Sequence, residues 1–147
     1  MWPIVRSIGL VFIGVVIAMT IFIAGQVVNA LVFMKGVDIR DDSAVRDAIP
    51  NLPVTAFVTL LLIYFVGTFC GAWVAARLTR HRWFASPWPM AHAMMVGLVL
   101  LIAGLPDIFS LPHPPWFFIG YFTVFPLGAY LAGWLVMAGK QTLSTSA

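Results

Sequence analysis

The sequence predicts an all-α membrane protein, an antiparallel bundle of four transmembrane helices with a short amphipathic outer helix between helices 1 and 2. Charged residues make up only 9% of the 147 residues, whereas a soluble domain carries roughly 25%. The mean hydropathy is +1.02, and four long runs contain no charged residue. These features exclude an ordinary soluble enzyme, a disordered chain and, with Cys70 as the single cysteine, a disulfide-stabilised scaffold.

The four spans are expected at about residues 7–34, 53–76, 89–111 and 115–139 of one transmembrane domain, followed by a polar tail without regular structure at 140–147. Each run reaches the ~20 apolar residues that a helix needs to cross a bilayer. The first run is longer than a hydrocarbon core of about 30 Å requires, so its helix is expected to tilt or to extend into water. It is also too long for the apolar region of a signal peptide, so we interpret it as an uncleaved span.

The connection between the first two spans predicts a short helix over Asp42–Ile49. Asp41 is suited to cap this helix, because its side-chain oxygen can accept hydrogen bonds from the first free N–H groups. Apolar residues recur on one face, and Pro50 is expected to stop the helix. Pro53 is then well placed to open the second span. The short helix is expected to lie on the outer membrane surface or to cap the bundle.

The distribution of basic residues predicts that both termini are cytoplasmic, because Lys and Arg near the ends of spans favour the cytoplasmic side. With the N-terminus inside, the cytoplasmic basic residues are Arg6, Arg77, Arg80, Arg82 and Lys140. The outer basic residues, which lie on the same side as all the Asp residues, are Lys35, Arg40 and Arg46. The compact arginine group at 77–82 is followed by tryptophans, and it is expected to contact lipid headgroups.

Small residues at a spacing of four predict close contacts between helices. The second span carries Gly67, Gly71 and Ala75, and the fourth carries Gly128 and Ala132. Small side chains let helix backbones approach closely in lipid. These lines are expected to pack within one bundle, and a seam between two copies of the chain is the alternative.

A group of polar side chains is expected at one depth, near the outer ends of the helices. Gln26 and Asn29 lie three residues apart, so they share one face of the first helix. At 1.5 Å per residue, Gln26 and Asp107 each lie about 27 Å from the inner ends of their spans. The other members are Thr55, Thr59 and Tyr121. The cluster indicates either an outward-facing cavity for a small polar ligand, a lipid headgroup or a partner helix, or hydrogen bonds between helices.

Three ionisable residues near the spans have structural interpretations of their own. Pro106 is expected to break the helix before Asp107, so that the carboxylate reaches water or caps a following turn. His113 lies in a proline-rich turn, which favours a rigid interfacial turn over a pH sensor. His92 has methionines nearby but would face away from them on a helix, so no metal site is expected.

Enzyme motifs are missing from the sequence, and no cofactor, metal or nucleic-acid partner is expected. The chain contains no Glu, which excludes an H-E-x-x-H metallopeptidase, and it has no P-loop, G-x-S-x-G or G-x-G-x-x-G motif. Cys70 is placed in mid-span, where a low dielectric keeps a thiol unreactive. No carboxylate is expected near the membrane midplane, where ion-coupled transporters usually need one.

The order of these elements resembles a group of uncharacterised four-span bacterial inner-membrane proteins. The features that carry the resemblance are polar residues late in the first helix, a Leu-Pro pair, a glycine-rich second helix ending in Ala-Ala-Arg, and a P-H-P-x-W-F turn before the last helix. In this chain they are Gln26–Asn29, Leu52-Pro53, Gly71–Arg77 and Pro112–Phe117. The resemblance implies a four-span fold in a bacterial inner membrane. Members of the group often carry Glu where this chain has Gln26, so no proton-linked role is implied.

The expected function is that of a non-enzymatic accessory or scaffold subunit in the lipid bilayer, which binds another membrane protein or a second copy of itself. The lines of small residues and the missing catalytic motifs favour this function. The alternative is a small transporter or channel with an outward-facing polar cavity, which the polar cluster favours.

Overall fold

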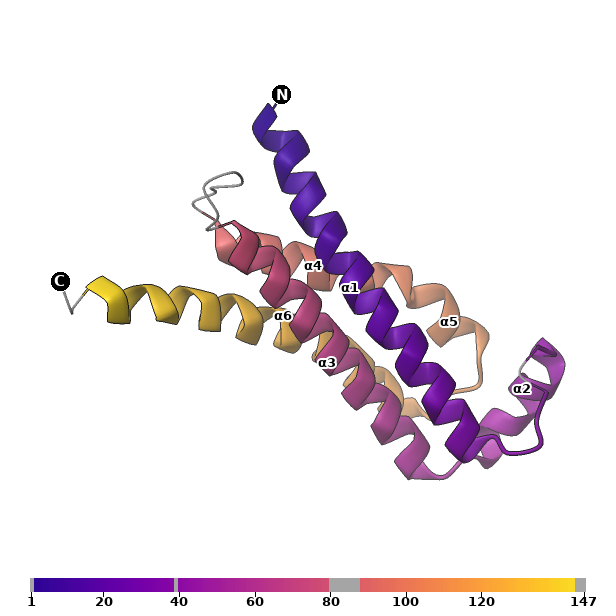
Figure 1. Ribbon diagram of the computed structural model, residues 1–147. Coiled ribbons are helices and arrows are strands. Elements are labelled where there is room, and N and C mark those ends of the chain that lie inside the picture. The colour runs from indigo at the N-terminus through magenta and orange to yellow at the C-terminus, as the bar shows by residue number, and fades with distance from the viewer. Residues whose placement is uncertain (1, 39, 80–87, 145–147) are drawn as a thin grey trace.

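The computed structural model describes residues 2–38, 40–79 and 88–144, and every regular element in these residues is helical. The elements are α1 (Trp2–Phe33), α2 (Asp42–Ala48), η1 (Ile49–Asn51), α3 (Val54–Leu78), α4 (Pro89–Ala103), α5 (Leu105–Ser110) and α6 (Pro115–Ser144). The long helices form a bundle, and α2 lies beyond one end of it, which we call the α2 end (Figure 1). The start of α1 and the end of α6 lie away from α2.

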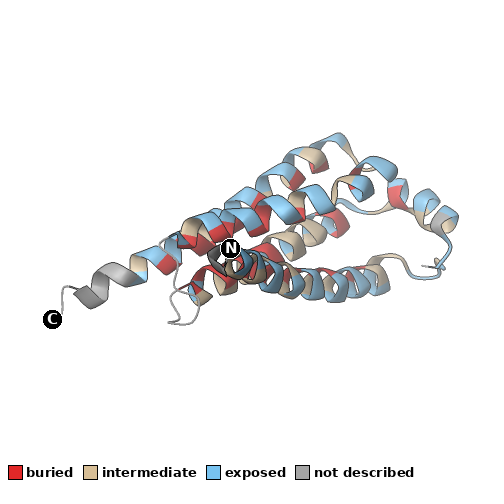
Figure 2. Cartoon of the chain, turned by 90° about the horizontal axis from the view of Figure 1, so that it is seen from above, coloured by how far each residue is buried: buried red, intermediate tan, exposed pale blue. Residues whose placement is uncertain are grey.

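Four helical segments are long and apolar enough to cross a membrane: Ile4–Phe33, Val54–Leu78, Pro89–Ser110 and Pro115–Gly139. The predicted fold class is confirmed, and the chain is a small multi-pass membrane protein. Buried residues lie between the helices, while many large apolar side chains are exposed on the outer faces (Figure 2). Lipid tails are as apolar as these side chains, so their exposure is favourable in a bilayer.

The short helix between the first two spans is confirmed as α2, and Asp41 caps it. The Asp41 carboxylate accepts hydrogen bonds from the backbone N–H groups of Ser43 and Ala44, at 2.9 and 3.4 Å, and from the Ser43 hydroxyl at 2.6 Å. These bonds stabilise the ionised carboxylate, the Ser43 hydroxyl most strongly, and they hold the pKa of Asp41 below its ordinary value.

The structure adds detail at one predicted helix end and corrects two others. The α-helix ends before Pro50 as predicted, with Ile49 as its C-cap, but the chain then continues through Pro50 as the 3-10 turn η1. The third span breaks at Gly104 and not at Pro106, because Pro106 lies in the first turn of α5, where its missing N–H costs no hydrogen bond. Residues 140–144 belong to α6 and are not an irregular tail, since no Pro or Gly interrupts the helix there.

Helices α1 and α3 cross where two glycines meet. A Cβ on Gly71 would lie against the backbone oxygen of Gly14, and a Cβ on Gly14 would lie 2.7 Å from the backbone oxygen of Gly71. Gly67 also faces α1, and Ala75 is completely buried. The line of small residues on the second span therefore packs inside the chain, against α1.

The line of small residues on the fourth span also packs inside the bundle. A Cβ on Gly128 would lie 3.2 Å from the backbone oxygen of Phe65, so α6 approaches α3 closely at this point. Ala132 is completely buried, and the adjacent Gly133 faces Ala93 of α4. These contacts hold the helices close together and determine which side chains face inward at the α2 end.

Candidate functional site

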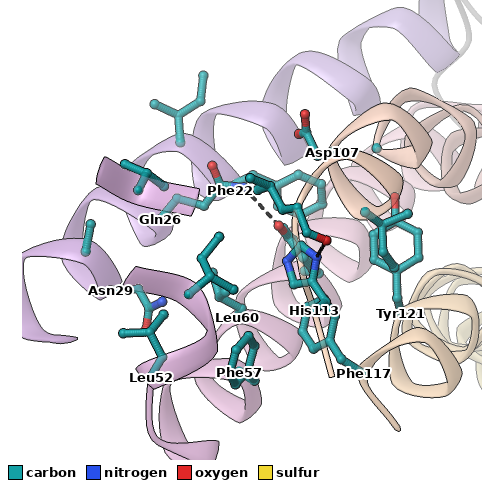
Figure 3. A pocket seen from close by; sticks show the side chains of 18 of the residues that line it. Phe22, Gln26, Asn29, Leu52, Phe57, Leu60, Asp107, His113, Phe117 and Tyr121 are labelled. Carbon is teal, nitrogen blue, oxygen red and sulfur yellow. Dashed lines mark hydrogen bonds between the residues drawn. The ribbon is translucent and has the colours of Figure 1, made fainter. Parts of the chain in front are cut away.

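A cavity of about 330 Å³ lies at the α2 end of the bundle (Figure 3). Its walls come from α1, α3, α4, α5 and α6, and residues of α2, η1 and the turn before α6 also line it. Most of the lining side chains are apolar or aromatic, among them Phe22, Phe57, Leu60, Leu100, Phe117 and Phe125. The volume falls within the ~300–1,000 Å³ typical of sites for small molecules.

The polar side chains that line the cavity are Gln26, Asn29, Tyr64, Asp107, His113 and Tyr121. Four members of the predicted outer cluster are thus brought together, from α1, α5 and α6. The other two, Thr55 and Thr59, do not line the cavity, and their assignment to this group is corrected. The face of α3 that carries Phe57, Leu60 and Tyr64 is turned toward the cavity, and the Thr59 hydroxyl donates to the Thr55 carbonyl at 2.8 Å.

Gln26 and Tyr64 join α1 to α3 across one side of the cavity. Gln26 Nε2 donates a hydrogen bond to the Tyr64 hydroxyl oxygen at 3.1 Å. The Tyr64 ring stacks on Phe125, with 5.8 Å between the ring centres, and packs against Phe22 in a T-shaped arrangement at 5.1 Å. Tyr64 is not a member of the cluster predicted from the sequence, although a tyrosine in the middle of an apolar span needs a hydrogen-bond partner and could have indicated this site.

Tyr121 is held by the break between α4 and α5. Its hydroxyl donates to the backbone carbonyl of Leu101 at 3.1 Å. This carbonyl lies in the last turn of α4, where carbonyl groups have no N–H donor within the same helix. A Cβ on Gly104 would collide with the Tyr121 hydroxyl, so only glycine leaves room for this bond. The break at Gly104 thus positions an aromatic wall of the cavity.

Asn29 is a deeply buried polar residue of the cavity, with 5% of its surface exposed. Its Oδ1 atom is buried and accepts no hydrogen bond from any residue that the structure describes. A buried acceptor left without a donor costs about 1–3 kcal/mol. The Asn29 Oδ1 atom can therefore accept a hydrogen bond from a molecule bound in the cavity.

Asp107 carries the formal charge of the cavity. It is exposed in the first turn of α5, and no other Asp, Glu, Lys or Arg lines the cavity in the described parts of the chain. His113 Nδ1 donates to the Leu111 carbonyl at 3.1 Å, and the ring stacks on Phe117 at 4.8 Å. Burial lowers the pKa of His113 below its ordinary value of 6.5, so the ring is neutral at pH 7. The cavity therefore holds one net negative charge.

The other residues singled out in the sequence lie elsewhere. His92 is buried near the start of α4, and its Nδ1 lies 2.8 Å from the Trp88 carbonyl. Among the residues that the structure describes, no group of three His, Cys, Asp or Glu could hold a metal ion. The Arg77 guanidinium lies 4.9 Å from the centre of the Trp73 ring, and Arg80 and Arg82 fall outside the described residues.

Comparison of the chain with protein-family models, curated proteins and solved structures found no match. The resemblance to four-span bacterial inner-membrane proteins therefore stays a prediction. The function is accordingly inferred from the chemistry of the cavity.

Proposed function

We propose that this small multi-pass membrane protein binds a small amphipathic molecule in the cavity at the α2 end. The buried, unpaired Oδ1 of Asn29 carries the proposal, because nearly all buried polar atoms in proteins have a hydrogen-bond partner. Apolar walls with a few polar groups are also typical of ligand sites. A ligand that donates a hydrogen bond to Asn29 removes the cost of the unpaired acceptor.

The proposed role is non-enzymatic. The lining contains no serine or cysteine that could act as a nucleophile, and no hydrogen bond joins Asp107 to His113 among the described residues. The expectation of an accessory or scaffold subunit loses one of its supports, because the small residues of α3 and α6 make contacts within the chain. We therefore favour ligand binding over assembly with a second membrane protein or a second copy.

Transport of the same ligand is the second candidate function, and the break in the third span favours it. Discontinuous helices are common at the substrate sites of membrane transporters, and the break at Gly104 lies on the cavity wall. Beyond the cavity, the bundle is filled by completely buried residues such as Ala72, Val96 and Ala129. A transporter would have to open this packed region. Ligand-dependent flux in reconstituted vesicles distinguishes a transporter from a binding protein.

We further propose that the α2 end faces outward across a bacterial inner membrane, following the excess of cytoplasmic Lys and Arg. In a Cys70→Ala background, Ser43→Cys on α2 is expected to react with an impermeant thiol reagent added to spheroplasts. Ser144→Cys at the end of α6 is expected to react only after the membrane is made permeable. Labelling of Ser144→Cys alone in intact spheroplasts would overturn the orientation.

Filling the cavity is expected to remove a bound small molecule. Ala30 is half-buried on the cavity wall, so Ala30→Trp places an indole in the space of the ligand. Ala24 is exposed on the same helix and does not line the cavity, which makes Ala24→Trp the matched control. Native mass spectrometry of protein purified from membranes should show a one-to-one adduct in the wild type and Ala24→Trp, and its loss in Ala30→Trp. Identical adducts in all three proteins contradict the proposed site.

A further inference from the structure

Two hydrogen-bond acceptors on the cavity wall lack a donor in the described structure, the buried Oδ1 of Asn29 and the Asp107 carboxylate. Gln26 donates to Tyr64, Tyr121 donates to Leu101, and His113 donates to Leu111, so these donors already have partners. The Oδ1 atom of Asn29 has no donor within the described residues. The same part of the chain provides no hydrogen bond or ion pair to the Asp107 carboxylate, whose backbone oxygen alone accepts from Leu111 and Ser110. Among the cavity acceptors without a donor in these residues, Asn29 Oδ1 is therefore the buried one and Asp107 is the one that carries a formal charge.

These two acceptors lie on opposite sides of the cavity. Figure 3 shows Asn29 on one side, close to Leu52, and Asp107 on the other side. Asn29 is deeply buried, whereas Asp107 is exposed. Apolar and aromatic side chains, among them Phe22 and Leu60, lie between them (Figure 3). A ligand that satisfies both acceptors needs a donor at each end and an apolar body in the middle.

The charge of the cavity determines which donor fits at the exposed end. A carboxylate in a partly apolar site attracts a cation more strongly than it would in water, because the local dielectric is lower. Aromatic faces such as those of Tyr64 and Phe125 also attract cations, and they repel anions. The donor near Asp107 is therefore best supplied by a protonated amine, and the donor near Asn29 by a neutral hydroxyl group, whose burial costs less than that of a second charge.

We propose that the ligand is an elongated amphipathic amine. Its ammonium group lies near Asp107, its apolar body lies among the aromatic rings, and its neutral hydroxyl group at the far end donates to Asn29 Oδ1. This inference rests on the proposed function and adds the chemical class of the ligand. The Asp107 charge disfavours an anionic amphiphile, such as a fatty acid, with its charged group at this end of the cavity.

Three probes that share one phenyl ring and one butyl chain test the two ends of the ligand separately. They are 4-(4-aminobutyl)phenol, which has both groups, 4-phenylbutylamine, which lacks the hydroxyl, and 4-butylphenol, which lacks the amine. A ligand that binds only the folded protein raises the melting temperature, which the intrinsic tryptophan fluorescence of the detergent-solubilised protein reports. The probe with both groups is expected to give the largest shift, and each missing group is expected to weaken binding on the order of tenfold.

Two variants assign each end of the ligand to its residue. In Asp107→Asn, the advantage of 4-(4-aminobutyl)phenol over 4-butylphenol is expected to disappear, while its advantage over 4-phenylbutylamine remains. In Asn29→Leu, its advantage over 4-phenylbutylamine is expected to disappear, while its advantage over 4-butylphenol remains. Asp47→Asn is the matched control, since Asp47 is an exposed aspartate of α2 that does not line the cavity, and it should behave as the wild type does.

The outcomes separate this inference from the proposed function. Equal shifts for all three probes, or an amine preference that persists in Asp107→Asn, overturn the assignment of an amine. The proposed function survives either result, because the probes still bind. If no probe shifts the melting temperature while Ala30→Trp removes the native adduct, the ligand class is again wrong and the binding site stands. If the native adduct is also unchanged in Ala30→Trp, both proposals fall.

Discussion

Gly71→Leu is expected to lower the melting temperature of the detergent-solubilised protein by about 10 °C, or to prevent folding, since overpacking a tight contact costs about 3 kcal/mol. A Cβ at position 71 would already meet the Gly14 backbone oxygen, and it would lie 3.0 Å from the Ala18 Cβ. A backbone atom cannot move aside as a flexible side chain can. The two helices must therefore separate, and the packing of α3 on α1 is lost over several turns.

Gly9→Leu is the control for this substitution. Gly9 lies on α1, and a Cβ there would have no neighbour within 4 Å. The same added side chain should then lie against lipid or detergent and leave the melting temperature nearly unchanged. Thermal unfolding followed by tryptophan fluorescence compares the two variants. Equal melting temperatures for Gly71→Leu and the wild type would show that this face of α3 does not pack on α1.

Asn29→Leu is expected to raise the stability of the ligand-free protein by about 1–3 kcal/mol, because it removes a buried acceptor without a donor and keeps the branching of the side chain at a site that borders a cavity. The Asn29 side chain is 5% exposed and its Oδ1 has no donor in the described structure. The same substitution should abolish retention of the native adduct. A gain in stability together with a loss of binding is the result expected of a residue whose amide serves a ligand.

Gln26→Leu provides the matched comparison on the same helix. Gln26 also lines the cavity, but its side chain is exposed and its Nε2 already donates to Tyr64 at 3.1 Å. Removing it breaks a hydrogen bond and should give no gain in stability. Urea or thermal unfolding of the two variants measures the difference. A lower stability of Asn29→Leu than of the wild type would mean that the amide has a partner within the protein.

Local features of the sequence were sufficient to predict the spans and the short helix. The hydropathy of each run depends only on its own residues, so the four apolar segments could be located without any knowledge of packing. The cap of α2 is equally local, because Asp41 bonds to groups two and three residues along the chain. The 3-10 turn at Pro50 and the break before Pro106 were not predicted, because a proline is compatible with the first turn of a new helix as well as with the end of an old one.

The tertiary structure decided which residues line the cavity. Depth along each span can be estimated from sequence, and Gln26, Asn29, Asp107 and Tyr121 do line one cavity. The rotation of each helix about its axis cannot be obtained in this way, because it depends on contacts between helices.

The contact of Gly14 with Gly71 and that of α6 with the α3 backbone at Gly128 set this rotation. They turn Tyr64 toward the cavity and place Thr55 and Thr59 outside it. The unpaired Oδ1 of Asn29 is likewise a property of the assembled bundle, since a buried atom lacks a donor only when every neighbouring helix has been placed around it.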